Sequence, residues 1–167
     1  GHTDGVADCW NGIAEIYRSK GNLADAERAY EQSELFFRRA GIDTEVVPKV
    51  NRGLIHLQRE NYQKTQELLL EVQSTLVHGS WGVLMPCVHA GLLACAAANA
   101  DWDAWAHHEK ELLAALEMSP MVEPDLADSL ERAANLAQVE GKTNLAVATW
   151  TIAQEQWRSL GNNDAVD

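Results

Sequence analysis

The residues best suited to chemistry in this sequence are histidines, cysteines and carboxylates in the second half of the chain. Cys87, His89 and Cys95 carry ligand types that zinc prefers. On a helix, however, residues two apart point in different directions, and residues eight apart are separated by about 12 Å along the axis. A zinc ion with ligands at about 2.0–2.3 Å cannot span that distance. We therefore expect no metal site among these three side chains.

A second group, His107, His108 and Glu111, has better spacing for metal binding. His107 and Glu111 are four residues apart and would share one face of a helix. Two ligands on a solvated helix face form at most a weak site, because zinc in proteins takes three or four protein ligands. We interpret the group as an exposed polar stripe, and we predict neither a metal ion nor a cofactor.

No arrangement typical of catalysis occurs in the sequence. A Ser-His-Asp order, a nucleophile elbow and a glycine-rich phosphate loop are all absent. Acidic pairs such as Glu109 and Glu111 are typical of solvated helix faces, where carboxylates keep their charge. We therefore predict that the chain is not an enzyme.

Composition and charge limit the classes of partner. The chain has 167 residues, of which 46% are hydrophobic, so a packed core is expected. Lys and Arg number 13 against 25 Asp and Glu, and the net charge of −12 would repel nucleic acid and anionic membranes. No apolar run approaches the roughly 18 residues that cross a bilayer. Three scattered cysteines are typical of free thiols in a reducing compartment, so we expect a cytoplasmic protein.

The elements that carry these side chains follow an internal repeat of about 40 residues. Each unit has the pattern of a helix, a tight turn and a second helix. The turns contain residues suited to ending one helix and capping the next. These turns are Gly21-Asn22, Glu60-Asn61, Ala100-Asp101 and Gly141-Lys142. A large apolar residue also stands near the end of each second helix, namely Phe37, Leu76, Leu116 and Trp157.

The third unit diverges most from the others. Trp105 falls in a column where the other units carry a small residue. A shift by one residue would place Ala104 there, but it would move Leu116 out of its column. The sequence leaves this register open.

The repeat predicts a single all-α domain of eight helices. Prolines support the helix limits, because Pro48, Pro86 and Pro124 lie at or just before helix entrances, where proline is tolerated. First helices are expected at 5–19, 45–59, 84–99 and 125–139, and second helices at 23–39, 62–77, 102–117 and 143–159. The four hairpins then span approximately 5–41, 45–80, 84–120 and 125–161.

The spacing Trp10-x-x-Ile13-Ala14-x-x-Tyr17-x-x-x-Gly21-x-x-x-x-Ala26-x-x-x-Tyr30 resembles the tetratricopeptide repeat. The resemblance spans nearly the whole chain. Its period is longer than the usual length of about 34 residues and is similar to the long-repeat subclass of large bacterial regulators. The resemblance implies a right-handed α-solenoid of four such hairpins. In this family the concave face of the stack binds peptides or protein segments.

Two segments, CWNGIAEIYRSKGNLADAERAYEQSELFFRRAG and NRGLIHLQRENYQKTQELLLE, are similar to the C-terminal repeat region of bacterial eukaryotic-like serine/threonine protein kinases. Kinase motifs are absent from the chain itself, so any kinase domain would lie outside it. We interpret Gly1-His2 as a tag remnant on a fragment of a longer protein. The resemblance therefore implies a scaffold or regulatory module of a larger bacterial signalling protein.

The family resemblance places the first helix of each hairpin on the concave face. The middle of that face would be apolar and its ends polar with acidic members, which suits a protein or peptide of apolar and basic character. An alternative for the alanine-rich helix around Ala94 and Ala97 is close packing against neighbouring helices. The residues expected to contact the partner are Asn11, Glu15, Asn51, Leu54, Leu57, Ala94, Ala97, Glu131 and Asn135.

Two other functions stay open. The groove could close on a small-molecule or peptide effector, and a deep pocket over Ala94 and Ala97 would favour that alternative. The domain could instead be an oligomerisation spacer. Repeat arrays normally end in a capping helix with a polar outer face, and here the sequence ends soon after Trp157. Either a capping helix was removed or this edge meets another molecule, for example in a homodimer through the C-terminal hairpin.

Overall fold

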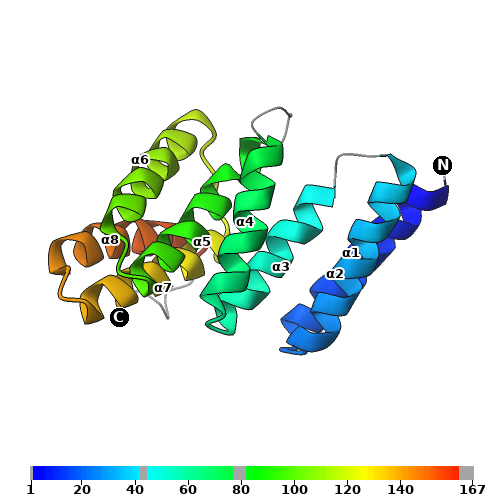
Figure 1. The fold of residues 1–167 in the computed structure, drawn as a ribbon, viewed down its shortest axis with the longest axis horizontal. Coiled ribbons are helices and arrows are strands. Elements are labelled where there is room, and N and C mark those ends of the chain that lie inside the picture. The colour runs from blue at the N-terminus through cyan, green and yellow to red at the C-terminus, as the bar shows by residue number, and fades with distance from the viewer. Residues whose placement is uncertain (1, 42–44, 77–81, 162–167) are drawn as a thin grey trace.

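The computed structural model describes residues 2–41, 45–76 and 82–161. Within these ranges the chain forms eight α-helices and contains no strand (Figure 1), which confirms the all-α prediction. Each helix begins and ends close to its expected limits. A short 3₁₀ helix, Gly82–Leu84, leads into the fifth α-helix. The α-helices are α1 (His2–Ser19), α2 (Leu23–Ala40), α3 (Val46–Gln58), α4 (Tyr62–Leu76), α5 (Met85–Ala98), α6 (Trp102–Met118), α7 (Pro124–Val139) and α8 (Thr143–Ser159).

Four equivalent turns join these helices into hairpins. At the first turn, the backbone N–H of Gly21 donates to the carbonyl of Arg18, and that of Asn22 donates to the carbonyl of Tyr17. This is the bonding of a Schellman motif, and the same pair of bonds recurs at the other three turns. The sequence predicted this turn column correctly. The residues with left-handed backbone are Gly21, Glu60, Ala100 and Gly141, with φ of 76°, 58°, 53° and 73°.

The turn bonding also fixes the register of the third unit. At each turn, the last residue before the second helix accepts a hydrogen bond at its backbone carbonyl. The donor is the backbone N–H of the residue four positions later, inside the second helix. The four pairs are Ala26 to Asn22, Thr65 to Asn61, Trp105 to Asp101 and Ala146 to Lys142. Trp105 therefore occupies the column of small residues, and its side chain is buried in the main core.

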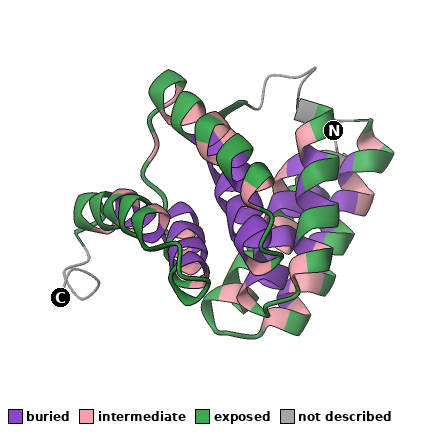
Figure 2. Cartoon of the chain, turned by 60° about the vertical axis from the view of Figure 1, so that its left-hand side comes forward, coloured by how far each residue is buried: buried purple, intermediate pink, exposed green. Residues whose placement is uncertain are grey.

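Helix α5 is the centre of the main core. It contains no charged residue and is buried along almost its whole length (Figure 2). It packs against α3, α4, α6 and α7, because a helix that is apolar on every side needs neighbours on every side. Two glycines allow the closest approach. An added Cβ would lie 2.8 Å from the Leu69 side chain at Gly53 and 2.5 Å from it at Gly91.

The first three hairpins follow one another along the long axis of the molecule, and the α7–α8 hairpin lies against the third (Figure 1). Two joints between hairpins share one pattern, in which the second helix of a hairpin meets the first helix of the next. Helix α2 meets α3 in this way, and α4 meets α5. The third joint differs, since α7 packs mainly against α5. The right-handed sense of the stack stays a prediction.

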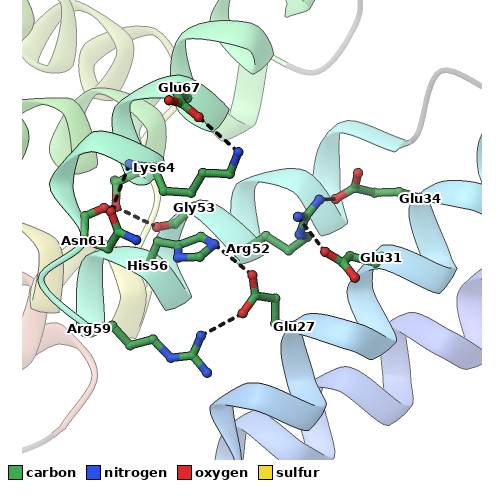
Figure 3. A network of polar contacts seen from close by, with 11 residues as sticks. Glu27, Glu31, Glu34, Arg52, Gly53, His56, Arg59, Asn61, Lys64 and Glu67 are labelled. Atoms are coloured by element: carbon green, nitrogen blue, oxygen red, sulfur yellow. Dashed lines mark hydrogen bonds and ion pairs between the residues drawn. The ribbon is translucent and has the colours of Figure 1, made fainter.

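The joint between α2 and α3 is held largely by charge (Figure 3). The guanidinium of Arg52 on α3 donates to Glu31 and Glu34 of α2, with both N–O distances at 2.9 Å. Ile55 is the α3 member of a small apolar cluster around α1 and α2, which is separate from the main core. The first hairpin therefore has its own core and is attached to the rest mainly by ion pairs.

Glu27 of α2 extends this ionic joint (Figure 3). Its two carboxylate oxygens lie 2.9 Å from Nε2 of His56 and 2.7 Å from Nη1 of Arg59. Burial lowers the pKa of His56; Glu27 opposes this effect, and the charges of Arg52 and Arg59 add to it. The imidazole is thus mainly neutral at pH 7, and the two arginines supply the positive charge of the joint.

Candidate partner-binding surface

Four of the residues predicted to line a groove are buried in the main core. Leu54 and Leu57 of α3, and Ala94 and Ala97 of α5, are at most 3% exposed. The prediction that they contact a partner is wrong, because α3, α4, α6 and α7 enclose α5 and leave these side chains no access to solvent. The two alanines serve close helix packing, which is the alternative that the sequence offered.

Three other predicted residues, Asn11, Glu15 and Asn51, lie on α1 and α3. The carboxylate of Glu15 accepts hydrogen bonds from the Tyr30 hydroxyl and, at 3.0 Å, from the side-chain amide of Asn51. Burial, followed by the bond to Glu15, raises the pKa of Tyr30, so the phenol keeps its proton and donates it. The side-chain oxygen of Asn11 is buried and has no hydrogen-bond partner among the described residues. These bonds hold Glu15 and Asn51 in fixed positions.

The last two predicted residues lie on α7, against two tryptophans of α8. Asn135 accepts a hydrogen bond from the indole N–H of Trp150 at 3.2 Å, and Glu131 accepts one from Trp157 at 3.3 Å. They therefore belong to the edge of the last hairpin, and the predicted site residues do not form one continuous surface. A hollow of about 250 Å³ at this edge is lined by Glu131, Trp150, Ala153, Gln154 and Trp157.

A polar hollow of about 460 Å³ lies where the ends of α1 and α3 meet the beginning of α7. Three carboxylates and one guanidinium line it, so its net charge is negative and complementary to a basic group. We name it the polar hollow. Its lining residues are Glu15, Arg18, Ser19, Gln58, Glu123, Pro124 and Asp125.

An ion pair between Arg18 of α1 and Asp125 of α7 joins the two ends of this hollow. The guanidinium donates to both carboxylate oxygens, and one of these bonds measures 2.9 Å. Burial by itself would lower the pKa of Arg18, but the hydrogen bond and charge of Asp125 outweigh burial and raise it. Sequence reasoning missed Glu123 and Asp125 as site residues. The repeat pattern describes neighbouring helices and carries no signal that α7 approaches α1.

A buried histidine pair is a polar feature that sequence reasoning also missed. Nδ1 of His89 and Nδ1 of His108 are 3.2 Å apart, so one nitrogen donates and the other accepts. Burial lowers the pKa of both, and for His108 burial and then the neighbouring His89 lower it to about 4. Both rings are therefore neutral at pH 7. The expectation of an exposed stripe holds for His107 and is wrong for His108, which faces α5.

Metal-ligating side chains and thiols occur among the described residues. No three of their histidine, cysteine or carboxylate side chains converge as the ligands of a metal ion would. Burial raises the pKa of Cys87 and Cys95 to about 12, so both thiols stay protonated at neutral pH and are poor nucleophiles. Among the described helices, none has the length and apolar character needed to cross a bilayer.

Comparison with known proteins bears on the fold alone. No family model matches the chain, and no curated protein matches it. Among solved structures 24 chains are similar, including the crystal structure of BtubC (BKLC) from P. vanneervenii, with a TM-score of 0.69 and 16% sequence identity. The similarity covers 95% of this chain and 66% of that one, so this chain spans just under two thirds of its length. At this identity the likeness establishes an all-α fold and leaves function to be argued from the surface.

Proposed function

We propose that this chain is a protein-interaction module of the tetratricopeptide type, and that it binds a basic segment of a partner at the polar hollow. The distribution of charge supports this assignment. Arg18 is shared between Asp125 and, at 4.0 Å, Glu15. Glu123 is then left without a cation among the described residues, in a hollow large enough for a long side chain. An Arg or Lys of the partner would neutralise it.

Because the apolar residues predicted to contact the partner are buried, the expected partner segment is basic and needs no apolar part. Leu54, Leu57, Ala94 and Ala97 are inaccessible, so the proposed contact is polar and depends on charge. The net charge of −12 adds a long-range attraction for basic segments. Because Arg18 and Glu15 are already fixed by hydrogen bonds, binding there costs little side-chain ordering.

We also propose that the module belongs to a larger cytoplasmic signalling protein of a bacterium, where it acts as a scaffold or regulatory region. The similarity of its repeats to those of bacterial serine/threonine kinases supports this context. The module would act by presenting a pre-stacked surface to the partner.

A peptide selection tests the proposed binding. A random peptide library displayed on phage would be panned on the immobilised 167-residue chain, and the selected sequences would be synthesised with a fluorescent label. We expect them to be rich in Arg and Lys. Their affinity, measured by fluorescence anisotropy, should fall about fivefold in Glu123→Gln, which removes one carboxylate charge worth about 1 kcal/mol.

The matched control is Glu140→Gln, at an exposed glutamate beyond the other end of α7. This variant should bind the selected peptides as tightly as the parent. Selection of peptides that lack basic residues would contradict the proposal, and so would equal losses of affinity in the two variants.

A further inference from the structure

A pocket of about 400 Å³ lies in the third hairpin, between α5, α6 and the 3₁₀ helix that leads into α5. Pockets of about 300–1,000 Å³ are typical sites for small ligands. Most of the lining is apolar, with one histidine, one carboxylate and one hydroxyl among it, and no lining residue belongs to the polar hollow. We name this site the α5–α6 pocket.

The first polar group of the pocket is the ring of His89, which lines it although the residue is 1% exposed. Nδ1 of this ring is paired with Nδ1 of His108 at 3.2 Å. Nε2, on the opposite edge of the ring, has no hydrogen-bond partner among the described residues. A polar atom that has lost water without gaining a partner is costly to bury. The pocket therefore offers an unused hydrogen-bonding position.

The second polar group is the carboxylate of Glu111, which is half-buried on α6 and forms no ion pair with a described residue. Its charge acts on the neighbouring imidazole: burial lowers the pKa of His89, and Glu111 opposes this effect. The ring stays neutral, so it does not compensate the carboxylate. Since no Lys or Arg is among the described lining residues, the pocket carries one negative charge without a cation.

The rest of the lining is apolar and partly open to solvent. Val83 of the 3₁₀ helix is 46% exposed, and Met118 at the end of α6 is 88% exposed. Ala114 and Ala115 lie between Glu111 and Met118 and have side chains too small to fill the space. An apolar ligand that covers Val83 and Met118 would gain the hydrophobic contribution of both. The unbranched side chain of Met118 can adapt to its shape.

We propose that the α5–α6 pocket binds a small organic amine with an apolar body. Its ammonium group donates one hydrogen bond to the carboxylate of Glu111 and another to Nε2 of His89. Its body lies against the apolar side chains of the pocket. Nε2 can accept because the Nδ1 pair allows the arrangement in which Nδ1 of His89 holds the proton and donates it to His108.

A free amine fits this pocket better than a lysine side chain of a protein. Both carry the same ammonium group, but the linear stem of lysine is narrow and is followed by polar amide groups. It would leave much of the apolar surface around Val83 and Met118 uncovered. A compact cyclic body beside the ammonium group covers that surface. The experiment therefore compares the two kinds of amine directly.

NMR titration of the isotope-labelled chain with phenethylamine and with cyclohexylmethylamine tests the proposal. We expect amide shifts to change at lining residues such as Met85 and Ala115. Phenylethanol, which replaces the ammonium group by a neutral hydroxyl, should bind about tenfold more weakly, and so should Nα-acetyl-lysine amide. A spectrum of the histidine rings with phenethylamine bound should show His89 protonated at Nδ1.

Variants locate the site. Glu111→Gln should weaken phenethylamine binding about tenfold. Glu109→Gln removes the same charge from the same helix outside the pocket, so it should bind like the parent. Ala114→Leu fills the pocket at an exposed position and should abolish binding, whereas Ala106→Leu, also exposed on α6 but outside the pocket, should not. Circular dichroism checks that each variant folds.

Four results would overturn the proposal, and the first two need no variant. One is the absence of shifts at the lining residues with both amines. Another is binding of phenylethanol or Nα-acetyl-lysine amide as tight as that of phenethylamine, since the ammonium group or the compact body would then be irrelevant. The others are equal affinities in Glu111→Gln and Glu109→Gln, and binding that Ala114→Leu retains.

Discussion

Among the described residues, non-glycine residues with left-handed backbone occur at two of the four turns. Glu60 and Ala100 have φ values of 58° and 53°, and this left-handed conformation costs an L residue roughly 1–2 kcal/mol. The equivalent turns use Gly21 and Gly141, which adopt it without steric cost. The strained turns persist because two backbone hydrogen bonds fix each of them.

Replacement of Ala100 by glycine should therefore stabilise the protein. We expect Ala100→Gly to raise the free energy of unfolding by about 1 kcal/mol, which is the relief of strain less the greater chain entropy that glycine loses on folding. Urea denaturation followed by circular dichroism measures this change. The reciprocal variant, Gly141→Ala, should lower the free energy by a similar amount. Changes of the same sign in both variants would show that backbone conformation is not the cause.

The neutral histidine pair makes stability depend on pH. The pKa of His108 is about 4 in the folded protein, below the ordinary value of 6.5, so between these values the unfolded chain binds a proton that the folded chain does not. The free energy of unfolding should therefore fall as the pH decreases from about 6.5 to about 4, by roughly 3 kcal/mol for this group.

The measurement compares urea denaturation of the parent and of His108→Gln across this pH interval. The variant lacks the titrating group, so its stability should fall less steeply as the pH decreases. Burial raises the pKa of Glu34, which acts in the opposite direction in both proteins and cancels in the comparison. Parallel pH profiles would exclude His108 as the source.

At the scale of the elements, Leu69 connects three helices. Its side chain on α4 lies against Gly53 of α3 and Gly91 of α5, at distances too short for an added Cβ. Two glycines in helix interiors would ordinarily weaken those helices by about 1 kcal/mol each. The close approach that they allow offsets this cost by burying Leu69 completely.

The effect of alanine at position 91 should depend on the residue at position 69. Gly91→Ala should destabilise the parent by about 1 kcal/mol net, because overpacking exceeds the gain in helix propensity. In a Leu69→Ala background, which itself costs about 2–5 kcal/mol, the same change should be neutral or stabilising since the space is empty. Chemical denaturation of the four proteins forms the double-mutant cycle. Additive effects would show that the two positions do not interact.

The helices and turns could be predicted from the sequence because their signals are local. Turn residues such as Gly21 and Gly141 lie next to the helices that they end, and the repeat places each element relative to the next. Which helix faces remain accessible could not be predicted. The burial of Leu54 and Ala94 depends on how helices far apart in the chain pack around α5, which no local signal specifies.

At the scale of the whole molecule, curvature decides where the candidate site lies. The polar hollow exists because the beginning of α7 returns to the end of α1, where Arg18 meets Asp125 across 107 positions of sequence. A repeat pattern indicates how adjacent hairpins pack. It does not determine the relative position of hairpins that are separated by several joints. Sequence reasoning therefore found Glu15 on the first helix and missed its partners on the fourth hairpin.

The ionic joint between α2 and α3 has a consequence for cooperativity. The first hairpin has its own apolar cluster, and pairs such as Arg52 with Glu34 attach it to the remaining hairpins. Dissolved salt screens these charges far more than it weakens hydrophobic contacts. Rising ionic strength should thus let the N-terminal hairpin melt as a separate foldon while the core around α5 stays intact.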